Sequence, residues 1–388
     1  MPLSCSLKVQ LGRQHCASDC PSEGEDAVFR YHRVERPQDL PAADPLAVDV
    51  AILDMNHGWP NLGHDSIVHA VKDAACDLGG ALVGTGLHVR ALSFDVRRSG
   101  VVPPGPDGRF SLYIGTGGPG HLDPRKNDGH SEGSQGILED PSWEAPVFRL
   151  FDAVVADETA ALLGICHSFG VLCRWSGAAE PTLRSREKGK STGILENVLT
   201  PEARQHPWFR RFAQELPDGR RLRVVENRLF DLLPREDRWP GFVVPLGYET
   251  QGLGGPRGEA VTMLEFARDR AGTMPRVLAV NHHPEIVDRF RQVMILNQKR
   301  DRGEVANEWY QERLEILTRS YPDEDIDQRL HVTSDYTFLG PLRFHLWRLV
   351  RQRAEARGLE TGVHEDQLLE ALERSAVGLD GGRSTEAF

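Results

Sequence analysis

The stretch LLGICHSFGVL, from Leu162 to Leu172, joins two apolar runs through a cysteine and a histidine. A short apolar run that meets small residues and then a second apolar run is typical of a buried strand that turns into a helix. Cys166 would stand at that turn, with Gly164 and Ser168 two residues away on each side. A nucleophile on such an elbow needs small neighbours there, because its backbone is strained. The alternative is an ordinary buried thiol at the end of a core strand.

Apolar runs and helical patterns alternate along the chain around this elbow. The pattern predicts buried strands in Ala47–Asn56, in His88–Phe94 and at the start of Phe110–Pro124. It also predicts a helix over Asp65–Gly79, with Asp65 as its cap and Gly79 at its end. Alternating strands and helices indicate an α/β fold, in which an open, mostly parallel sheet lies between helices on both faces, giving three layers.

The chain of 388 residues is long enough for more than one structural unit. Residues 1–45 are polar, which predicts an N-terminal leader with little defined structure, and residues 46–290 would hold the sheet. Beyond Glu285, apolar residues recur at helical intervals, with the strongest helical pattern in Gly340–Gly358. Residues 291–388 are therefore expected to form a helical C-terminal extension.

The composition excludes several classes of partner. A net charge of −11 argues against a general nucleic-acid binder. No apolar run is long enough to span a bilayer, and the N-terminus lacks the pattern of a secretory signal, so we expect a cytoplasmic protein with no membrane partner and reduced cysteines. Cys5, Cys16 and Cys20 lie near His15, but their spacing matches no strong zinc signature. We expect neither a metal nor a cofactor.

A catalytic thiolate needs a base, and the base needs a group that orients it. The segment AVNHHPE, which ends at Glu285, offers His282, His283 and Glu285 after an apolar strand. Because side chains alternate along a strand, His283 and Glu285 can point to the same side. Glu285 could then hold the imidazole of His283, and His282 would be a neighbour in the pocket.

Three motifs together resemble the class I glutamine amidotransferases, which carry a Cys-His-Glu triad on a flavodoxin-like α/β sheet. The family elbow is G-x-C-x-G-x-Q, and this chain has GICHSFG from Gly164 to Gly170. The late motif of the family is His-Pro-Glu after an apolar strand, and this chain has VLAVNHHPE. The oxyanion loop of the family is Gly-Gly-Pro-Gly or similar, and this chain has GTGGPGH. The order of the motifs agrees, and the resemblance covers about residues 48–290.

This resemblance implies a role for each matching residue. Cys166 would be the nucleophile, His283 the base and Glu285 the orienting group. The backbone N–H groups of His167 and of a glycine in the pair Gly117 and Gly118 would hold the oxyanion. The implied reaction is attack on the γ-carboxamide of glutamine, or on a related γ-glutamyl or amide bond, followed by release of ammonia and hydrolysis of a thioester.

The chain departs from the family pattern within the elbow. Ser168 replaces the second glycine, His167 replaces a residue that is usually apolar or aromatic, and Gly170 replaces the glutamine that helps to hold the substrate. Ser168, Gly170 and His282 are therefore candidates for the substrate pocket. Asn56 and His57 are further candidates, because the carboxyl ends of parallel strands line the ligand crevice of such sheets, although loop capping is the alternative.

Two functions from different classes follow. The first is a glutaminase-type amidotransferase or cysteine amide hydrolase, whose small-molecule substrate is glutamine or a γ-glutamyl or amide compound. No synthetase signature is present in the rest of the chain, so an acceptor of ammonia would lie on a separate acceptor or synthetase subunit. The second is a noncatalytic binding or scaffold subunit that keeps the fold and uses its C-terminal helices as an interaction surface.

Overall fold

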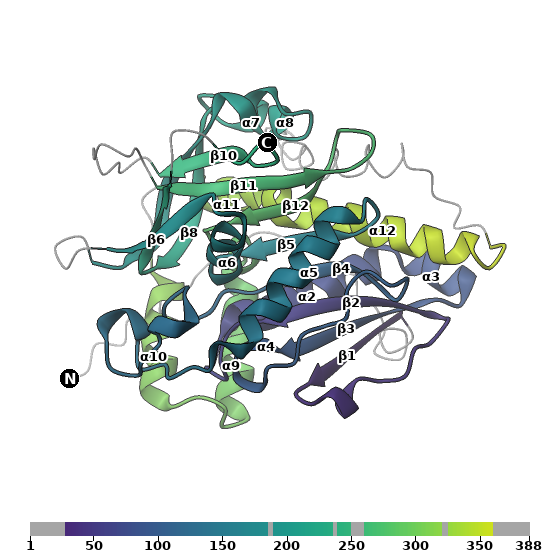
Figure 1. The fold of residues 1–388 in the computed structure, drawn as a ribbon, viewed down its shortest axis with the longest axis horizontal. Coiled ribbons are helices and arrows are strands. Elements are labelled where there is room, and N and C mark those ends of the chain that lie inside the picture. The colour runs from purple at the N-terminus through teal and green to yellow at the C-terminus, as the bar shows by residue number, and fades with distance from the viewer. Residues whose placement is uncertain (1–27, 185–188, 236–238, 250–259, 320–324, 360–388) are drawn as a thin grey trace, which may run out of the picture.

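The computed structural model describes residues 28–184, 189–235, 239–249, 260–319 and 325–359 (Figure 1). Ten strands form one sheet in the order β1-β3-β2-β4-β5-β12-β11-β10-β7-β8. Its parallel half contains β1 (Phe29–Val34), β3 (His88–Asp95), β2 (Ala47–Asp54), β4 (Phe110–Gly115), β5 (Ala161–Ile165) and β12 (Pro275–Val280). Its antiparallel half contains β11 (Val261–Arg268), β10 (Val244–Glu249), β7 (Ser191–Leu199) and β8 (Arg221–Arg228). A separate pair is formed by β6 (Ala179–Leu183) and β9 (Phe230–Pro234).

Helices cover both faces of this sheet, as the alternating pattern predicts. One face packs against α2 (Leu62–Asp77), α3 (Gly79–Thr85), α7 (Pro201–Gln205), α8 (Phe209–Glu215) and α12 (Gly340–Glu355). The other face packs against α4 (Val96–Ser99), α5 (Glu144–Ala156) and α6 (His167–Ser176), and Figure 1 shows α5 and α6 in front of the strands. The expected three-layer, mostly parallel α/β fold is confirmed. The continuous apolar runs of the parallel strands are explained by this double burial.

The helical C-terminal region is present as α9 (Arg289–Asp301), α10 (Asn307–Thr318), α11 (Ile326–Ser334) and α12, with a π-helical segment (Asp335–Leu339) between the last two. Helix α12 buries Leu346, Trp347 and Val350 in the same apolar core as the sheet. At the other end of the chain, β1 lies inside the segment 1–45 and pairs in parallel with β3. Helix α12 therefore belongs to the layer on one face, and β1 is an edge strand of the sheet itself, so the described part of the segment 1–45 is more ordered than its polar sequence predicts.

Helix α2 begins earlier than its sequence pattern predicts. The side chain of Asn61 accepts hydrogen bonds from the backbone N–H groups of Gly63 and His64, so Asn61 and not Asp65 is the cap. Asp65 instead forms an ion pair with Lys299 of α9, at 2.7 Å. The predicted cap was wrong because a second capping residue precedes it. The consequence for the site is that the N-terminus of α2 lies near Glu285.

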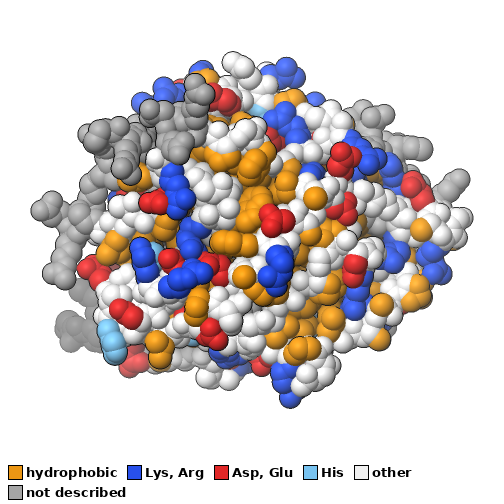
Figure 2. Space-filling model, viewed as in Figure 1, with side chains coloured by type: hydrophobic (Ala, Val, Ile, Leu, Met, Phe, Trp, Pro, Cys, Tyr) orange, Lys and Arg blue, Asp and Glu red, His pale blue; other side chains and the backbone are white. Residues whose placement is uncertain are grey.

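The face of the molecule that Figure 2 shows is not dominated by charges of one sign. Lysine, arginine and acidic side chains are interspersed there, and hydrophobic side chains gather over the region of α5 and α6. None of the helices among the described residues is both long enough and apolar enough to cross a membrane.

Candidate active site

Cys166 lies between β5 and α6 with a backbone that few non-glycine residues adopt. Its φ is 49° and its ψ is −96°, and it is the residue that precedes the first turn of α6. The backbone N–H of Cys166 donates to the carbonyl of Val280 in β12, at 2.8 Å. A side chain at Gly164 would meet Leu172 Cδ1 at 2.8 Å and Ala279 Cβ at 3.2 Å. The strand-to-helix elbow expected from the sequence is present, and its glycine is required by close packing.

Ser168 closes the same elbow from the other side. Its hydroxyl donates to the carbonyl of Thr116, at 2.8 Å, and its side chain occupies the space beside Gly115 that a Cβ would fill. Thr116 in turn donates through its backbone N–H to the carbonyl of Leu53. Ser168 therefore ties the elbow to the glycine loop after β4, and its side chain is buried away from the cavity described below.

His283 is held between the antiparallel half of the sheet and Glu285. Its backbone N–H donates to the carbonyl of Val225 at 2.8 Å, and its Nδ1 lies 2.8 Å from Glu285 Oε1. Both side chains are almost fully buried. With Nδ1 engaged by the carboxylate, Nε2 is left without a hydrogen-bond partner among the described residues. A base oriented in this way presents its second nitrogen to the reacting group.

The glycine loop brings Cys166 and His283 to one point. A Cβ built on Gly117 would lie 2.9 Å from His283 Cε1 and 3.5 Å from Cys166 Cβ. Burial alone would lower the pKa of His283, but the charges of Glu285 and of the Cys166 thiolate outweigh it and hold this pKa well above its usual value. The three expected triad residues are therefore adjacent, and the charges of Cys166 and Glu285 act on the pKa of His283.

The expected oxyanion donors lie at the same point. His167 is the first residue of α6, and the first N–H groups of a helix have no acceptor within it. Gly118 packs against the carbonyl of Met55 so closely that a side chain would collide with it. Arg97 fixes this contact, since it donates to the carbonyls of Met55 (2.8 Å) and Pro119 (2.7 Å). The buried pair of Arg97 and Glu139, at 2.6 Å, anchors the loop in turn.

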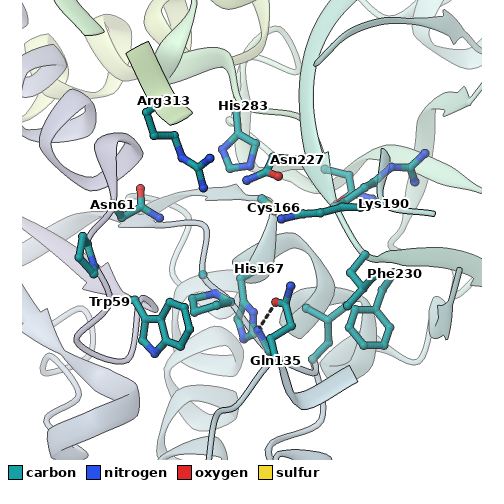
Figure 3. Close-up of a pocket in the computed structure, with 18 of the residues that line it drawn as sticks. Trp59, Asn61, Gln135, Cys166, His167, Lys190, Asn227, Phe230, His283 and Arg313 are labelled. Carbon is teal, nitrogen blue, oxygen red and sulfur yellow. Dashed lines mark hydrogen bonds between the residues drawn. The ribbon is translucent and has the colours of Figure 1, made fainter. Parts of the chain in front are cut away.

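A cavity of about 370 Å³ opens above these groups. Figure 3 shows His283 and Arg313 on one side of Cys166, and His167 and Gln135 on the other. The remaining polar and aromatic side chains come from segments far apart in the sequence. The lining includes Trp59, Asn61, Gln135, Lys190, Asn227, Phe230, Asn281, Trp309, Glu312 and Arg313.

None of the five residues expected as pocket candidates lines this cavity. Asn56 donates to Asp54 Oδ1 at 2.6 Å and accepts from Asn61 at 2.5 Å, so it organises the loop after β2. His57, in the same loop, has a left-handed backbone with a φ of 55°. Loop geometry, the alternative considered for both residues, accounts for these contacts.

His282 and Gly170 are also directed elsewhere. His282 is buried, and its Nε2 lies 3.2 Å from Thr337 Oγ1 in the π-helical segment. Burial lowers the pKa of His282 to about 3, so the ring is neutral. Gly170 lies against Leu122, whose methyl groups fill the space that a Cβ at position 170 would occupy. Leu122 itself lines the cavity, so an apolar side chain closes the region beside the missing glutamine.

The sequence pattern missed the residues that close the cavity from above. Lys190, which directly precedes β7, lines the cavity, while residues 185–188 lie outside the described residues. Burial lowers the pKa of Lys190, and the charge of Cys166 partly opposes this effect. Arg313 stacks over Trp309, with 5.3 Å between its Cζ and the ring centroid. The only sequence signal for these residues was the basic character of the segment before β7 and the helical period of α10.

Neither a metal centre nor a disulfide emerges in the part of the chain that the structure describes. No group of three or more His, Cys, Asp or Glu side chains there could hold a metal ion. Cys166 and Cys173 are free thiols. Cys5, Cys16, Cys20 and His15 lie outside the described residues.

The chain is similar to several solved structures of glutamine amidotransferases. It is 15% identical to one from Thermotoga maritima, with a TM-score of 0.40, over 78% of this chain and 98% of that one. It is 15% identical to one from Methylobacillus flagellatus, with a TM-score of 0.39, over 82% and 98%. It is 10% identical to the glutaminase domain of Trypanosoma brucei CTPS with bound acivicin, with a TM-score of 0.34, over 61% and 86%. No protein-family model and no curated protein sequence matches the chain. The fold stated above rests on the strand order and not on these similarities.

Replacing Gly63 by alanine should disturb the site without unfolding the chain. A Cβ at this position would lie 2.5 Å from Glu285 Oε1, so Glu285 must move and its hydrogen bond to His283 is weakened. We expect alkylation of Cys166 by iodoacetamide near neutral pH to slow by about tenfold or more. Gly84→Ala is the matched control, because nothing lies within 4 Å of its added methyl group. Equal alkylation rates in the two variants would contradict this role of Gly63.

His283 should titrate at a higher pH than an ordinary histidine. The negative charges of Glu285 and Cys166 favour its protonated form, so the Cys166→Ala variant should show a lower pKa for His283 than the parent protein. The ring ¹⁵N and ¹H shifts followed by NMR against pH measure this directly. His282 is an internal reference, because its burial keeps it neutral over the same range. An unchanged titration of His283 in the variant would show that the thiolate is not its neighbour.

Proposed function

We propose that this protein is a glutaminase-type cysteine amide hydrolase that acts on glutamine or on a related γ-glutamyl amide. The observation that carries the proposal is the meeting of Cys166, on a strained elbow, with a His283 ring that Glu285 holds by Nδ1 at 2.8 Å. A buried thiol with a purely structural role needs neither the left-handed backbone nor an oriented imidazole beside it.

The reaction proceeds in two halves. The Cys166 thiolate attacks the amide carbonyl, and the negative charge that forms on the carbonyl oxygen is held by the backbone N–H groups of His167 and Gly118. Nε2 of protonated His283 gives its proton to the departing nitrogen, which leaves as ammonia or an amine while the acyl group stays on Cys166 as a thioester. Water then attacks the thioester, His283 takes a proton from that water, and the carboxylic acid leaves with the thiolate restored.

Charge around the cavity favours an acyl group that is itself anionic. Lys190 lines the cavity, and the charges of Cys166 and Glu312 act on it without forming an ion pair, so a substrate carboxylate would give it a direct partner. Asn227 and Gln135 add amide groups on the same walls, and Gln135 Oε1 accepts from the N–H of Gly120 at 2.8 Å. These groups suit the α-carboxylate and α-amino group of a γ-glutamyl compound.

The proposal also covers the cellular compartment of the protein and the acceptor of its product. We place the protein in the cytoplasm, where free thiols such as Cys166 persist. If ammonia is the product that is used, its acceptor or synthetase lies on a separate protein. A noncatalytic scaffold has no specific observation in its favour, since it would not require the pairing of His283 with Glu285.

A glutamine analogue with an electrophilic diazo-ketone group tests the proposal. Mass spectrometry of the intact protein should show one adduct, which disappears in Cys166→Ala and persists in the control Cys173→Ala, because Cys173 is fully buried. Release of ammonia from glutamine, or of amine from a γ-glutamyl amide, should fall by about 10³-fold or more in Cys166→Ala. If the parent protein gains no adduct and cleaves none of these amides, the proposed function is wrong.

A further inference from the structure

A second cavity adjoins the cavity over Cys166, and His283 lines both of them. The volume of the second cavity is about 200 Å³. It shares six lining residues with the cavity over Cys166: Pro60, Asn61, Asn227, His283, Trp309 and Arg313. The shared residues form the wall between the two spaces, so a molecule in one of them needs to pass only these side chains to reach the other.

The second cavity differs from the first in its chemistry. Most of its side chains outside the shared wall are aliphatic, and they include Ile194, Val225, Ile286, Val287, Leu317 and Leu330. The polar ones, Thr192, Glu226, Arg289 and Gln292, are fewer, and Glu226, Arg289 and Gln292 are engaged by Arg228, Asp327 and Ser66. A cavity of about 150 Å³ with aliphatic and aromatic walls is sufficient for a benzene molecule. The second cavity therefore has the size and lining for one small apolar group.

The catalytic geometry determines which part of a substrate faces this cavity. The carbonyl oxygen must lie at the N–H groups of His167 and Gly118, and neither of these residues lines the second cavity. The departing nitrogen must lie at Nε2 of His283, because that atom supplies its proton. His283 lines both cavities. A substituent on the departing nitrogen would thus point toward the second cavity, while the acyl group stays in the first.

We propose that the leaving amine of the substrate carries an apolar substituent, which binds in the second cavity. This inference rests on the proposed function, and it narrows the substrate class from amides in general to N-substituted γ-glutamyl amides with an aliphatic or aromatic amine. The atoms balance as for the simple amide: the C–N bond breaks, His283 protonates the nitrogen, and an amine in place of ammonia leaves with its apolar group.

Helix α10 forms the outer wall of both cavities. Tyr310 is the only buried residue of α10, and the other residues of this helix are exposed or partly buried. Trp309 and Arg313 stand on the boundary, and Leu317 lies one turn further along, in the second cavity. Leu314 lies on the same helix with similar partial burial but lines neither cavity. The helix therefore offers a matched pair of leucines for a test.

The first arm of the test compares two isosteric substrates, N-butyl and N-(3-hydroxypropyl) γ-glutamyl amide. Their amide bonds are equally reactive, and only the end of the leaving group differs. Both groups share three methylenes, so the comparison isolates the terminal hydroxyl, whose burial among aliphatic side chains without a hydrogen-bond partner is unfavourable. We expect kcat/KM for the butyl amide to exceed that for the hydroxypropyl amide by about tenfold or more. Equal kcat/KM values would overturn the inference while leaving the proposed function in place.

The second arm uses Leu317→Trp, which fills the cavity, and Leu314→Trp, which does not. Leu317→Trp should abolish the preference for the butyl amide, whereas Leu314→Trp should keep it. The inference is overturned if both variants keep it or both lose it. If the parent protein cleaves none of the amides and the diazo-ketone analogue does not label Cys166, the proposed function fails and the inference fails with it.

Discussion

The left-handed backbone of Cys166 is the constraint on which the rest of the site depends. A residue with a φ of 49° is maintained only where its surroundings fix it, and three contacts do so here. The N–H of Cys166 is bound to Val280, Gly164 allows Leu172 and Ala279 to approach, and Ser168 is tied to Thr116. Because Val280 ends the strand that leads to His283, the same hydrogen bond that supports the elbow also sets the distance between nucleophile and base.

The parts of the site that could be predicted are those that one segment encodes alone. The elbow, the glycine loop and the pair of His283 and Glu285 each follow an apolar strand, and parallel strands bring their carboxyl ends to one edge of the sheet. The pairing of His283 with Glu285 was expected from alternation along a continuing strand, but the strand ends at Val280, and the two side chains instead meet at the start of a short 3₁₀ helix. Because β4, β5 and β12 are neighbours in the sheet, the three motifs that follow them lie side by side.

The rest of the cavity could not be predicted because it depends on contacts between distant segments. Lys190 directly precedes β7 and Asn227 lies in β8, whereas Trp309 and Arg313 lie in α10, which is separated from the last motif by the whole of α9. Asn56 failed as a pocket residue for a local reason, since its side chain is used by Asp54 and Asn61. Polarity after a strand indicates the edge of the sheet, but it does not distinguish a loop bond from a ligand contact.

The departures from the elbow pattern have a common physical meaning. Leu122 occupies the space beside Gly170, and His167 is a buried neutral ring, since burial and the nearby charge of Arg97 hold its pKa far below the usual value. Ser168 preserves the turn. The elbow therefore keeps its backbone geometry, while Leu122 and not position 170 supplies the side chain that lines the cavity there.

The most direct measurement is a crystal structure of the protein with Cys166 acylated or alkylated by the glutamine analogue. The account predicts that the carbonyl oxygen of the adduct lies within hydrogen-bond distance of the backbone N–H groups of His167 and Gly118, with Nε2 of His283 beside the sulfur and the acyl carboxylate near Lys190. An adduct whose oxygen points away from both N–H groups, or whose formation separates His283 from Glu285, would contradict it.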